Sequence, residues 1–155
     1  MIDFLTKEDF ISLNEFNLKW RFTEEKYNCL PVEDLSLIQP LSKRKAREIY
    51  RYSRKFLGNA SLLKSEFSTV ESLQTSDDYE AVRDWLRAKE ILPETRVAIS
   101  WDKANCVITS WRVFCKYWDD FCYPSSDDIL VWSSPEDWFL YYCHHEIFEY
   151  GIKKS

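Results

Sequence analysis

Glycine is scarce in this chain, which has two glycines and five prolines among 155 residues. Phosphate-binding loops are built around several glycines, and turn-dense β-sandwiches use many glycines and prolines. The scarcity therefore argues against a glycine-looped nucleotide-binding protein and against a sandwich. The patterns GxSxG, GxxxxGKS and GxGxxG are missing, as is the zinc-deaminase signature, so no familiar catalytic motif identifies an enzyme.

We expect no secretory signal at the start of the chain, and the sequence contains no long apolar run. Its start, MIDFLTKEDF, has neither a basic nor an apolar region, and no run approaches the roughly 18–20 apolar residues that span a bilayer. Five cysteines, an odd number without tight spacing, are typical of reduced and buried thiols rather than of a disulfide framework. We therefore expect a soluble, cytoplasmic protein without a cofactor, a bound metal or a membrane partner.

Aromatic residues, in contrast, are abundant. They make up 17% of the chain and include seven tryptophans, within a hydrophobic fraction of 45%, which is enough to build one folded domain over residues 1–155. Most of these tryptophans fall on elements with regular periodicity, so we expect a buried position for Trp101, Trp111, Trp118, Trp132 and Trp138.

The net charge of −5 is unevenly distributed. Residues 117–152 contain no Lys or Arg but eight carboxylates, which are Asp119, Asp120, Asp127, Asp128, Glu136, Asp137, Glu146 and Glu149. A region of one sign disfavours nucleic acid and anionic lipid as partners, and it favours a cationic partner such as a basic protein.

Hydrophobic periodicity predicts an α+β fold. Helical patterns cover residues 6–16, 31–38, 42–57, 76–92 and 111–122. Strand patterns cover residues 19–23, 67–72, 95–101, 106–111, 127–132, 138–145 and 147–153. From these patterns we expect an antiparallel sheet of about five strands, mainly from the C-terminal half, packed against three to five helices.

The segment KYWDDFCYPSSDDILVW (residues 116–132) contains two aspartate pairs, Asp119/Asp120 and Asp127/Asp128. The first pair follows a predicted helix, where negative charge is mildly unfavourable, so a use outside the fold is plausible. Four interpretations stay open: contact with a cationic partner, binding of Mg²⁺ or Ca²⁺, acid–base chemistry, and an ordinary solvated loop.

Both histidines of the chain lie in the segment YYCHHEIFEYG. On a strand, Cys143 and His145 would share one face, and His144 and Glu146 the other. A histidine with a nearby carboxylate suits acid–base chemistry, which makes His144, His145 and Glu146 candidate catalytic residues. No HExxH, CxxC or HxxxH spacing is present, and an ordinary strand end is the alternative.

Four arginines form a basic stripe on the predicted helix at 42–57, where Arg44, Arg47, Arg51 and Arg54 are spaced by 3, 4 and 3 residues. Such a row is a candidate contact for phosphates or for an anionic protein. A solvated face, paired with acids elsewhere in the fold, is the alternative, and the negative net charge speaks against a dedicated nucleic-acid-binding protein.

The C-terminal half, SWRVFCKYWDDFCYPSSDDILVW…DWFLYYCHHEIFEYG, resembles a family of short cytoplasmic proteins of Gram-negative bacteria that carries a domain of unknown function. The resemblance covers residues 97–151, with a weaker echo in PVEDLSLIQPLS (residues 31–42). It implies no activity and no catalytic residue. The composition, which is acidic and rich in Trp, is in addition similar to that of bacterial toxin-immunity proteins.

Two functional hypotheses follow from the sequence. The first is a protein-binding module that uses an acidic, aromatic-rich C-terminal face and the four aspartates of residues 116–132, with an immunity-type inhibitor as one form of it. The second is a metal-dependent or acid–base enzyme in which His144, His145 and Glu146 meet those aspartates in one pocket. The sequence favours the first and gives no oligomeric state.

Overall fold

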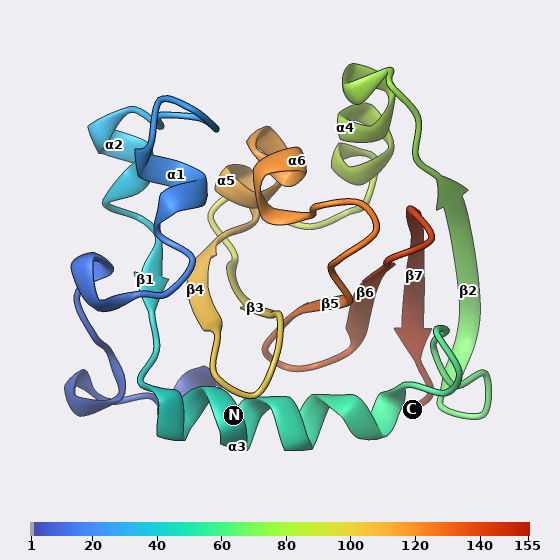
Figure 1. Cartoon of the computed structure of the whole chain (residues 1–155). Coiled ribbons are helices and arrows are strands. Elements are labelled where there is room, and N and C mark those ends of the chain that lie inside the picture. The colour runs from blue at the N-terminus through green and yellow to red at the C-terminus, as the bar shows by residue number, and fades with distance from the viewer. Residues whose placement is uncertain (1) are drawn as a thin grey trace.

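The computed structural model describes residues 2–155, and a single seven-stranded sheet runs through them (Figure 1). Its strand order is β1-β4-β3-β5-β6-β7-β2, and every neighbouring pair is antiparallel. The strands are β1 (Gln39–Pro40), β2 (Phe67–Gln74), β3 (Arg96–Ser100), β4 (Cys106–Ser110), β5 (Ile129–Ser133), β6 (Trp138–Cys143) and β7 (Ile147–Lys153).

Most helices are single turns or little more, and α3 and α4 are the two longer ones. The α-helices are α1 (Trp20–Thr23), α2 (Val32–Leu35), α3 (Lys43–Ser53), α4 (Tyr79–Arg87), α5 (Trp111–Lys116) and α6 (Trp118–Phe121). The 3₁₀ helices are η1 (Ile2–Phe4), η2 (Lys7–Asp9), η3 (Leu13–Glu15) and η4 (Arg54–Phe56). The α+β class is therefore confirmed, whereas the sheet has seven strands instead of about five.

Helices cover both faces of the sheet. Side chains along β3 alternate between the two faces of the sheet. Ala98 lies on the face that α3 covers with Ala46 and Ile49. Val97 lies on the opposite face, which α1, α4, α5 and α6 cover. Figure 1 shows α3 along one side of the sheet and the other α-helices toward the opposite side. Because both faces are covered, β4, β5 and β6 are buried along their whole length.

Two sequence predictions about the N-terminal third are wrong. Residues 19–23 form helix α1 and not a strand, and residues 6–16 form the separate turns η2 and η3 and not one helix. Over five residues an apolar alternation fits either a strand or one helical turn, and here tertiary packing of Phe22 in the core decides the outcome.

The expectations for the aromatic residues and the thiols are confirmed. Trp101, Trp111, Trp118, Trp132 and Trp138 are all buried. All five cysteines are free thiols, and four of them are buried, with Cys29 the exposed exception. Among residues 2–155, no helix has the length and the apolar character needed to cross a bilayer.

Candidate functional site

Residues 116–132 place their two aspartate pairs in different pockets. Helix α5 ends at Lys116, because Tyr117 has the non-helical angles φ −119° and ψ 29°, and the single turn α6 carries the first pair. The loop after Pro124 carries the second pair to the start of β5. Tyr117, Trp118, Phe121 and Trp132 are buried in the core, so these four aromatic residues of the segment are not available to a partner, whereas Tyr123 is half-buried.

Asp127 is paired with a cation of the same chain. Its two carboxylate oxygens accept hydrogen bonds from both terminal nitrogens of Arg21, at 2.7 and 3.1 Å. The backbone N–H of Tyr123 also donates to Asp127, at 2.7 Å, and the guanidinium lies 4.2 Å from the centre of the Tyr123 ring. Both charged side chains are buried, so this two-point pair stabilises the fold and leaves neither charge free for a partner.

Asp128 lies beside His144. The Oδ1 atom of Asp128 is 2.9 Å from Nδ1 of His144, and it accepts hydrogen bonds from the His144 backbone N–H and from the Tyr141 hydroxyl. Burial alone would raise the pKa of Asp128, but the hydrogen bonds from His144 outweigh it, and the pKa lies below its usual value. The ring of His145 packs against that of His144, with 4.1 Å between their centres.

His144, His145 and Glu146 lie in the turn between β6 and β7, not on a strand. The prediction that these residues alternate between two faces is therefore wrong. Glu146 adopts a positive φ of 65°, and its carbonyl oxygen accepts hydrogen bonds from Thr75 and Gln74 of the neighbouring strand end. Across residues 2–155 no three His, Cys, Asp or Glu side chains gather closely enough to hold a metal ion.

The first aspartate pair lines an open cleft between α4 and the α5–α6 segment, which we call the α4–α6 cleft. The cleft has a volume of about 440 Å³, and its lining residues are Asn28, Glu80, Arg83, Arg87, Lys116, Tyr117, Asp119 and Asp120. Asp119 is partly exposed and lies 3.7 Å from Arg83. Glu146 and Asp119 also share a much smaller pocket of about 60 Å³ beside the cleft.

Asp120 is the deepest charged group of the α4–α6 cleft. Its Oδ2 atom accepts a hydrogen bond of 2.8 Å from the side-chain amide of Asn28, and no other donor contacts it among the described residues. Burial raises the pKa of Asp120 to about 6; the neighbouring charge of Asp119 adds to the increase, and Asn28 and Arg83 oppose it. The carboxyl group therefore changes its protonation state close to neutral pH.

A comparison among the buried aspartates shows that Asp120 is the exception. Asp9, Asp34, Asp120 and Asp127 are between 5% and 9% exposed. Asp9 pairs with Arg44 and Lys45, Asp34 with Arg112 and Lys116, and Asp127 with Arg21. No Lys, Arg or His of residues 2–155 lies within ion-pair distance of Asp120. Because a buried charge without a partner is costly, Asp120 is poorly explained by the fold alone.

The cations of the cleft are mostly engaged already. Arg83 pairs with Glu80 and Asp119 and donates to the carbonyl oxygens of residues 115 and 116. Lys116 pairs with Asp34, which also accepts a hydrogen bond from the Tyr117 hydroxyl. That hydrogen bond from Tyr117, together with the two cations beside the carboxylate, lowers the pKa of Asp34 to about 2. Arg87 is exposed at the rim and has no acidic partner among the described residues.

The structure separates the four arginines of the basic stripe. Arg44 pairs with Glu48 and Asp9, whereas Arg47 and Arg51 are exposed without such partners in the described part of the chain. Arg54 turns inward, and its Nη2 donates to the carbonyl oxygens of residues 100, 101 and 128. Burial lowers the pKa of Arg54, and the neighbouring Tyr50 opposes that effect.

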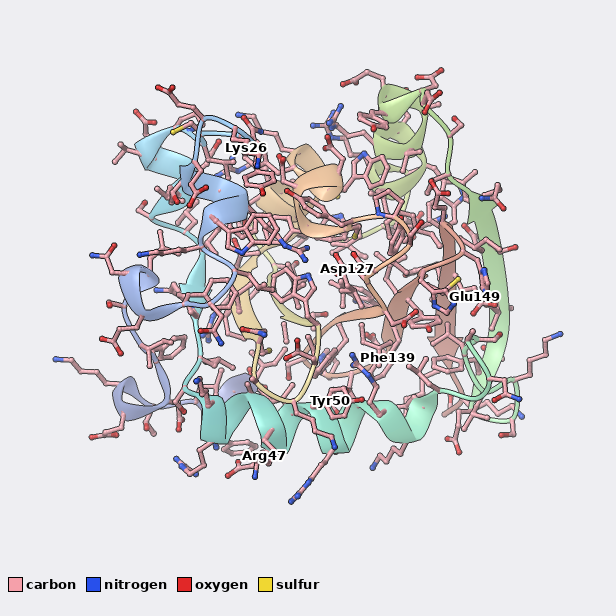
Figure 2. The ribbon with its side chains drawn as sticks, in the orientation of Figure 1. Lys26, Arg47, Tyr50, Asp127, Phe139 and Glu149 are labelled. Atoms are coloured by element: carbon pink, nitrogen blue, oxygen red, sulfur yellow. The ribbon has the colours of Figure 1, made fainter. Side chains whose placement is uncertain are left out.

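Arg54 and Asp127 face a second pocket of about 220 Å³, which lies between α3 and the loop before β5. Figure 2 shows Asp127 above Tyr50 of α3, and both residues line this pocket. Its lining residues are Leu18, Arg21, Tyr50, Arg54, Trp101, Asp102, Ser126, Asp127 and Asp128. The four aspartates of residues 116–132 and the histidine pair thus do not converge on one centre. Asp119 and Asp120 line one pocket, and Asp127 and Asp128 line another.

Sequence reasoning did not identify Arg21, Asn28 or Arg83, although each contacts one of the four aspartates. Arg21 and Asp127 are separated by 106 positions, and Asn28 and Asp120 by 92. Only one signal was available, namely that Arg21 stands between the aromatic residues Trp20 and Phe22 in a segment that must be partly buried.

A family model described as "Protein of unknown function (DUF2947)" matches residues 10–151. The chain belongs to this family. Membership in the DUF2947 family confirms the resemblance to a domain of unknown function, and it extends that resemblance from residues 97–151 to nearly the whole chain. No curated protein and no solved structure matches the chain. The DUF2947 family carries no assigned activity, so a function has to be argued from the site.

Proposed function

We propose that this member of the DUF2947 family is a protein-binding module, and that the α4–α6 cleft receives a Lys or Arg side chain of a basic partner. The observation that carries the proposal is Asp120, which is 9% exposed, borders an open cleft and has no cation within ion-pair distance among the described residues. The other three aspartates of comparable burial each have a cation of the same chain. A cation of the partner would supply the counter-charge that the fold does not provide for Asp120.

The charges around Asp120 fit a cationic group better than an anionic one. Arg83 forms ion pairs with Glu80 and Asp119, and Lys116 forms one with Asp34. The positive charges of both residues are therefore largely neutralised within the chain. The carboxylate of Asp120 has no ion pair in the described part of the chain, and the other unpaired charge of the cleft, that of Arg87, lies at the exposed rim. Charge-assisted hydrogen bonds from a guanidinium or an ammonium group to a partly desolvated carboxylate are among the stronger interactions at protein interfaces.

Exposed aromatic side chains stand next to the cleft. Tyr27 precedes the cleft residue Asn28 and is 44% exposed, and Tyr79 precedes Glu80 and is 47% exposed. Tyrosine is enriched at binding hot spots because it offers an apolar ring and a polar hydroxyl. Arg87 at the rim, which has no acidic partner in the described part of the chain, favours a partner segment that also carries an acidic residue.

This proposal narrows the predicted binding face. The tryptophans of the C-terminal half are buried and Asp127 is held by Arg21, so a broad acidic, aromatic surface is not what a partner would meet. The contact is instead confined to the cleft and to its two tyrosines. The similarity of composition to toxin-immunity proteins suggests an inhibitor of a basic toxin as one partner class, and this stays a prediction.

Binding of short basic peptides tests the proposal. The wild-type protein should bind an arginine-rich peptide, and Asp120→Asn should weaken that binding by about tenfold, because a buried charge pair contributes more than a solvated one. The matched control is Asp128→Asn, which removes one negative charge beside His144 and should change the affinity little. Equal losses in the two variants would show that the peptide responds to net charge only, and the proposed site would be wrong.

Acid–base catalysis is a second candidate, favoured by one observation. A carboxyl group with a pKa of about 6 in a cleft has the proton affinity that a general acid or base needs near neutral pH. In this case Asp120→Asn would abolish turnover of a substrate without weakening its binding. In the binding proposal the same variant weakens binding, so the two candidates predict opposite results.

A further inference from the structure

The outward side of α3 carries a row of cations, which we call the α3 ridge. It consists of Lys43, Arg47 and Arg51, four residues apart, and Lys55 in η4 continues the spacing. Residues four apart lie on the same side of a helix, with a rise of about 6 Å between neighbours. All four residues are exposed, and Figure 2 shows Arg47 on the side of α3 that faces away from the sheet.

The cations of the α3 ridge are not neutralised by their neighbours. Glu48 is the one acidic residue of α3, and it pairs with Arg44 and Lys45, which lie beside the ridge. Lys43, Arg47 and Arg51 have no ion pair and no side-chain hydrogen bond within residues 2–155. The ridge therefore presents a concentrated positive charge, although the chain as a whole has a net charge of −5.

The class of partner follows from the lack of exposed large apolar side chains on α3. The large apolar side chains exposed among residues 2–155 are Phe4, Tyr27, Val32, Leu37, Tyr79, Leu92 and Ile152, and none of these belongs to α3. Protein interfaces centre on aromatic and other apolar side chains, and helices that insert into membranes need an apolar face. A nucleic-acid backbone needs only a row of cations within reach of its phosphates.

We propose that the α3 ridge binds the sugar–phosphate backbone of a nucleic acid, without sequence specificity. This departs from the expectation drawn from the net charge, because binding depends on the local field of the contact face as well as on the total. The proposal also changes the residues of the predicted anion contact. Arg47 and Arg51 remain in it, whereas Arg44 and Arg54 are engaged within the fold. Lys43 and Lys55 replace these two arginines in the contact.

The ridge and the α4–α6 cleft lie on opposite sides of the sheet. The inner face of α3 packs in a different core from that of α4 and α6. Both sites can therefore be occupied at the same time, and the ridge proposal does not depend on the function proposed for the cleft. A partner in the cleft and a nucleic acid on the ridge would be held by one small protein.

Fluorescence anisotropy with a short labelled duplex DNA and a short single-stranded RNA tests the ridge. Four phosphate contacts predict a slope of about −3.6 for duplex DNA in a plot of log affinity against log salt concentration, which is a loss of about 150-fold between 50 and 200 mM salt. The ridge variant replaces Lys43, Arg47, Arg51 and Lys55 by Gln, which has a similar helix propensity. It should bind at least about tenfold more weakly at 50 mM salt.

The control variant replaces Lys26, Lys64, Arg96 and Lys103 by Gln. These residues are exposed and belong neither to α3 nor to η4, and the change in net charge is the same. The control variant should retain the wild-type affinity. Equal losses in the two variants, or no binding of either nucleic acid at 50 mM salt, would overturn the proposal. Ridge-dependent binding of an acidic peptide or of anionic vesicles, without binding of nucleic acid, would assign the ridge to another partner and would equally overturn it.

Discussion

Arg21 and Asp127 form a two-point ion pair in the interior, although 106 positions separate them in the sequence. This contact ties the N-terminal helix α1 to the loop that leads into β5. Asp127, which has no Lys or Arg near it in the sequence, is thus compensated by a cation from outside residues 117–152. The lack of local cations in the sequence therefore did not imply an exposed acidic surface.

Breaking this pair on one side should destabilise the protein strongly. Asp127→Asn or Arg21→Gln leaves a buried charge without its partner, which typically costs about 3–5 kcal/mol. Urea unfolding at pH 7 measures the loss. The control Asp128→Asn removes a more exposed carboxylate and should cost clearly less. A loss below about 1 kcal/mol for Asp127→Asn would contradict the structural role of the pair.

Asp120→Asn should stabilise the folded protein, in contrast to the substitutions that break the Arg21–Asp127 pair. Asp120 has a pKa of about 6 in the folded protein against a usual value of 3.8, so the folded state disfavours the ionised form. That cost is fully present above pH 6 and disappears as the pH falls toward 4. It amounts to roughly 3 kcal/mol at most, from the size of the shift in pKa.

The neutral amide avoids this cost, so Asp120→Asn should unfold at a higher urea concentration than the wild type at pH 8 and at the same concentration near pH 4. A gain in stability together with a loss of peptide binding is the pattern expected of a group kept for function. If Asp120→Asn is destabilised at pH 8, the carboxylate has a stabilising partner in the fold, and the argument from its isolation fails.

Arg54, at the start of η4, should behave as a structural residue, unlike Arg51 in α3. Arg54 holds three carbonyl oxygens at the ends of β3 and before β5, so Arg54→Gln leaves several buried acceptors with fewer donors. The expected loss of stability is about 2 kcal/mol or more. Arg51→Gln, on the exposed face, should change stability by less than about 0.5 kcal/mol. Similar thermal unfolding of the two variants would refute this distinction.

The cysteines should differ sharply in reactivity. Burial raises the pKa of the thiols of Cys106 and Cys115 to about 12, whereas Cys29 is exposed. Because the thiolate is the reactive form, a chromogenic thiol reagent should modify one cysteine quickly in the native protein and all five after denaturation. Rapid reaction of a second thiol in the native state would show that the core opens more readily than its packing indicates.

The sequence predicted the elements whose signal is local. The α3 helix with its cap at Ser42, the β3–β4 hairpin and the strands β5 and β6 were expected from periodicity and turn residues, and the structure contains them. Strand β1 was not expected, because two residues have no periodicity and β1 exists only through its pairing with β4. The turn at His144 was read as a strand because the apolar alternation of β6 runs directly into it.

The candidate site was predictable only in part. The Asp pairs stood out because they interrupt an aromatic segment, and Asp120 does lie in a cleft. Its isolation was not predictable, because it depends on which of the chain's cations reach which of its acids across the fold. The same reason explains why Arg44 and Arg54, identical in type to Arg47 and Arg51, are engaged within the fold while the other two are not.

The most direct test of the central claim is the pKa of Asp120, measured by carbon-13 NMR of its side-chain carboxyl group with and without an arginine-rich peptide. The free protein should show a value near 6, and the peptide should lower it, because a bound cation stabilises the carboxylate. A value near 4 in the free protein, or a value near 6 that the bound peptide leaves unchanged, would contradict the claim that Asp120 is the recognition group of the α4–α6 cleft.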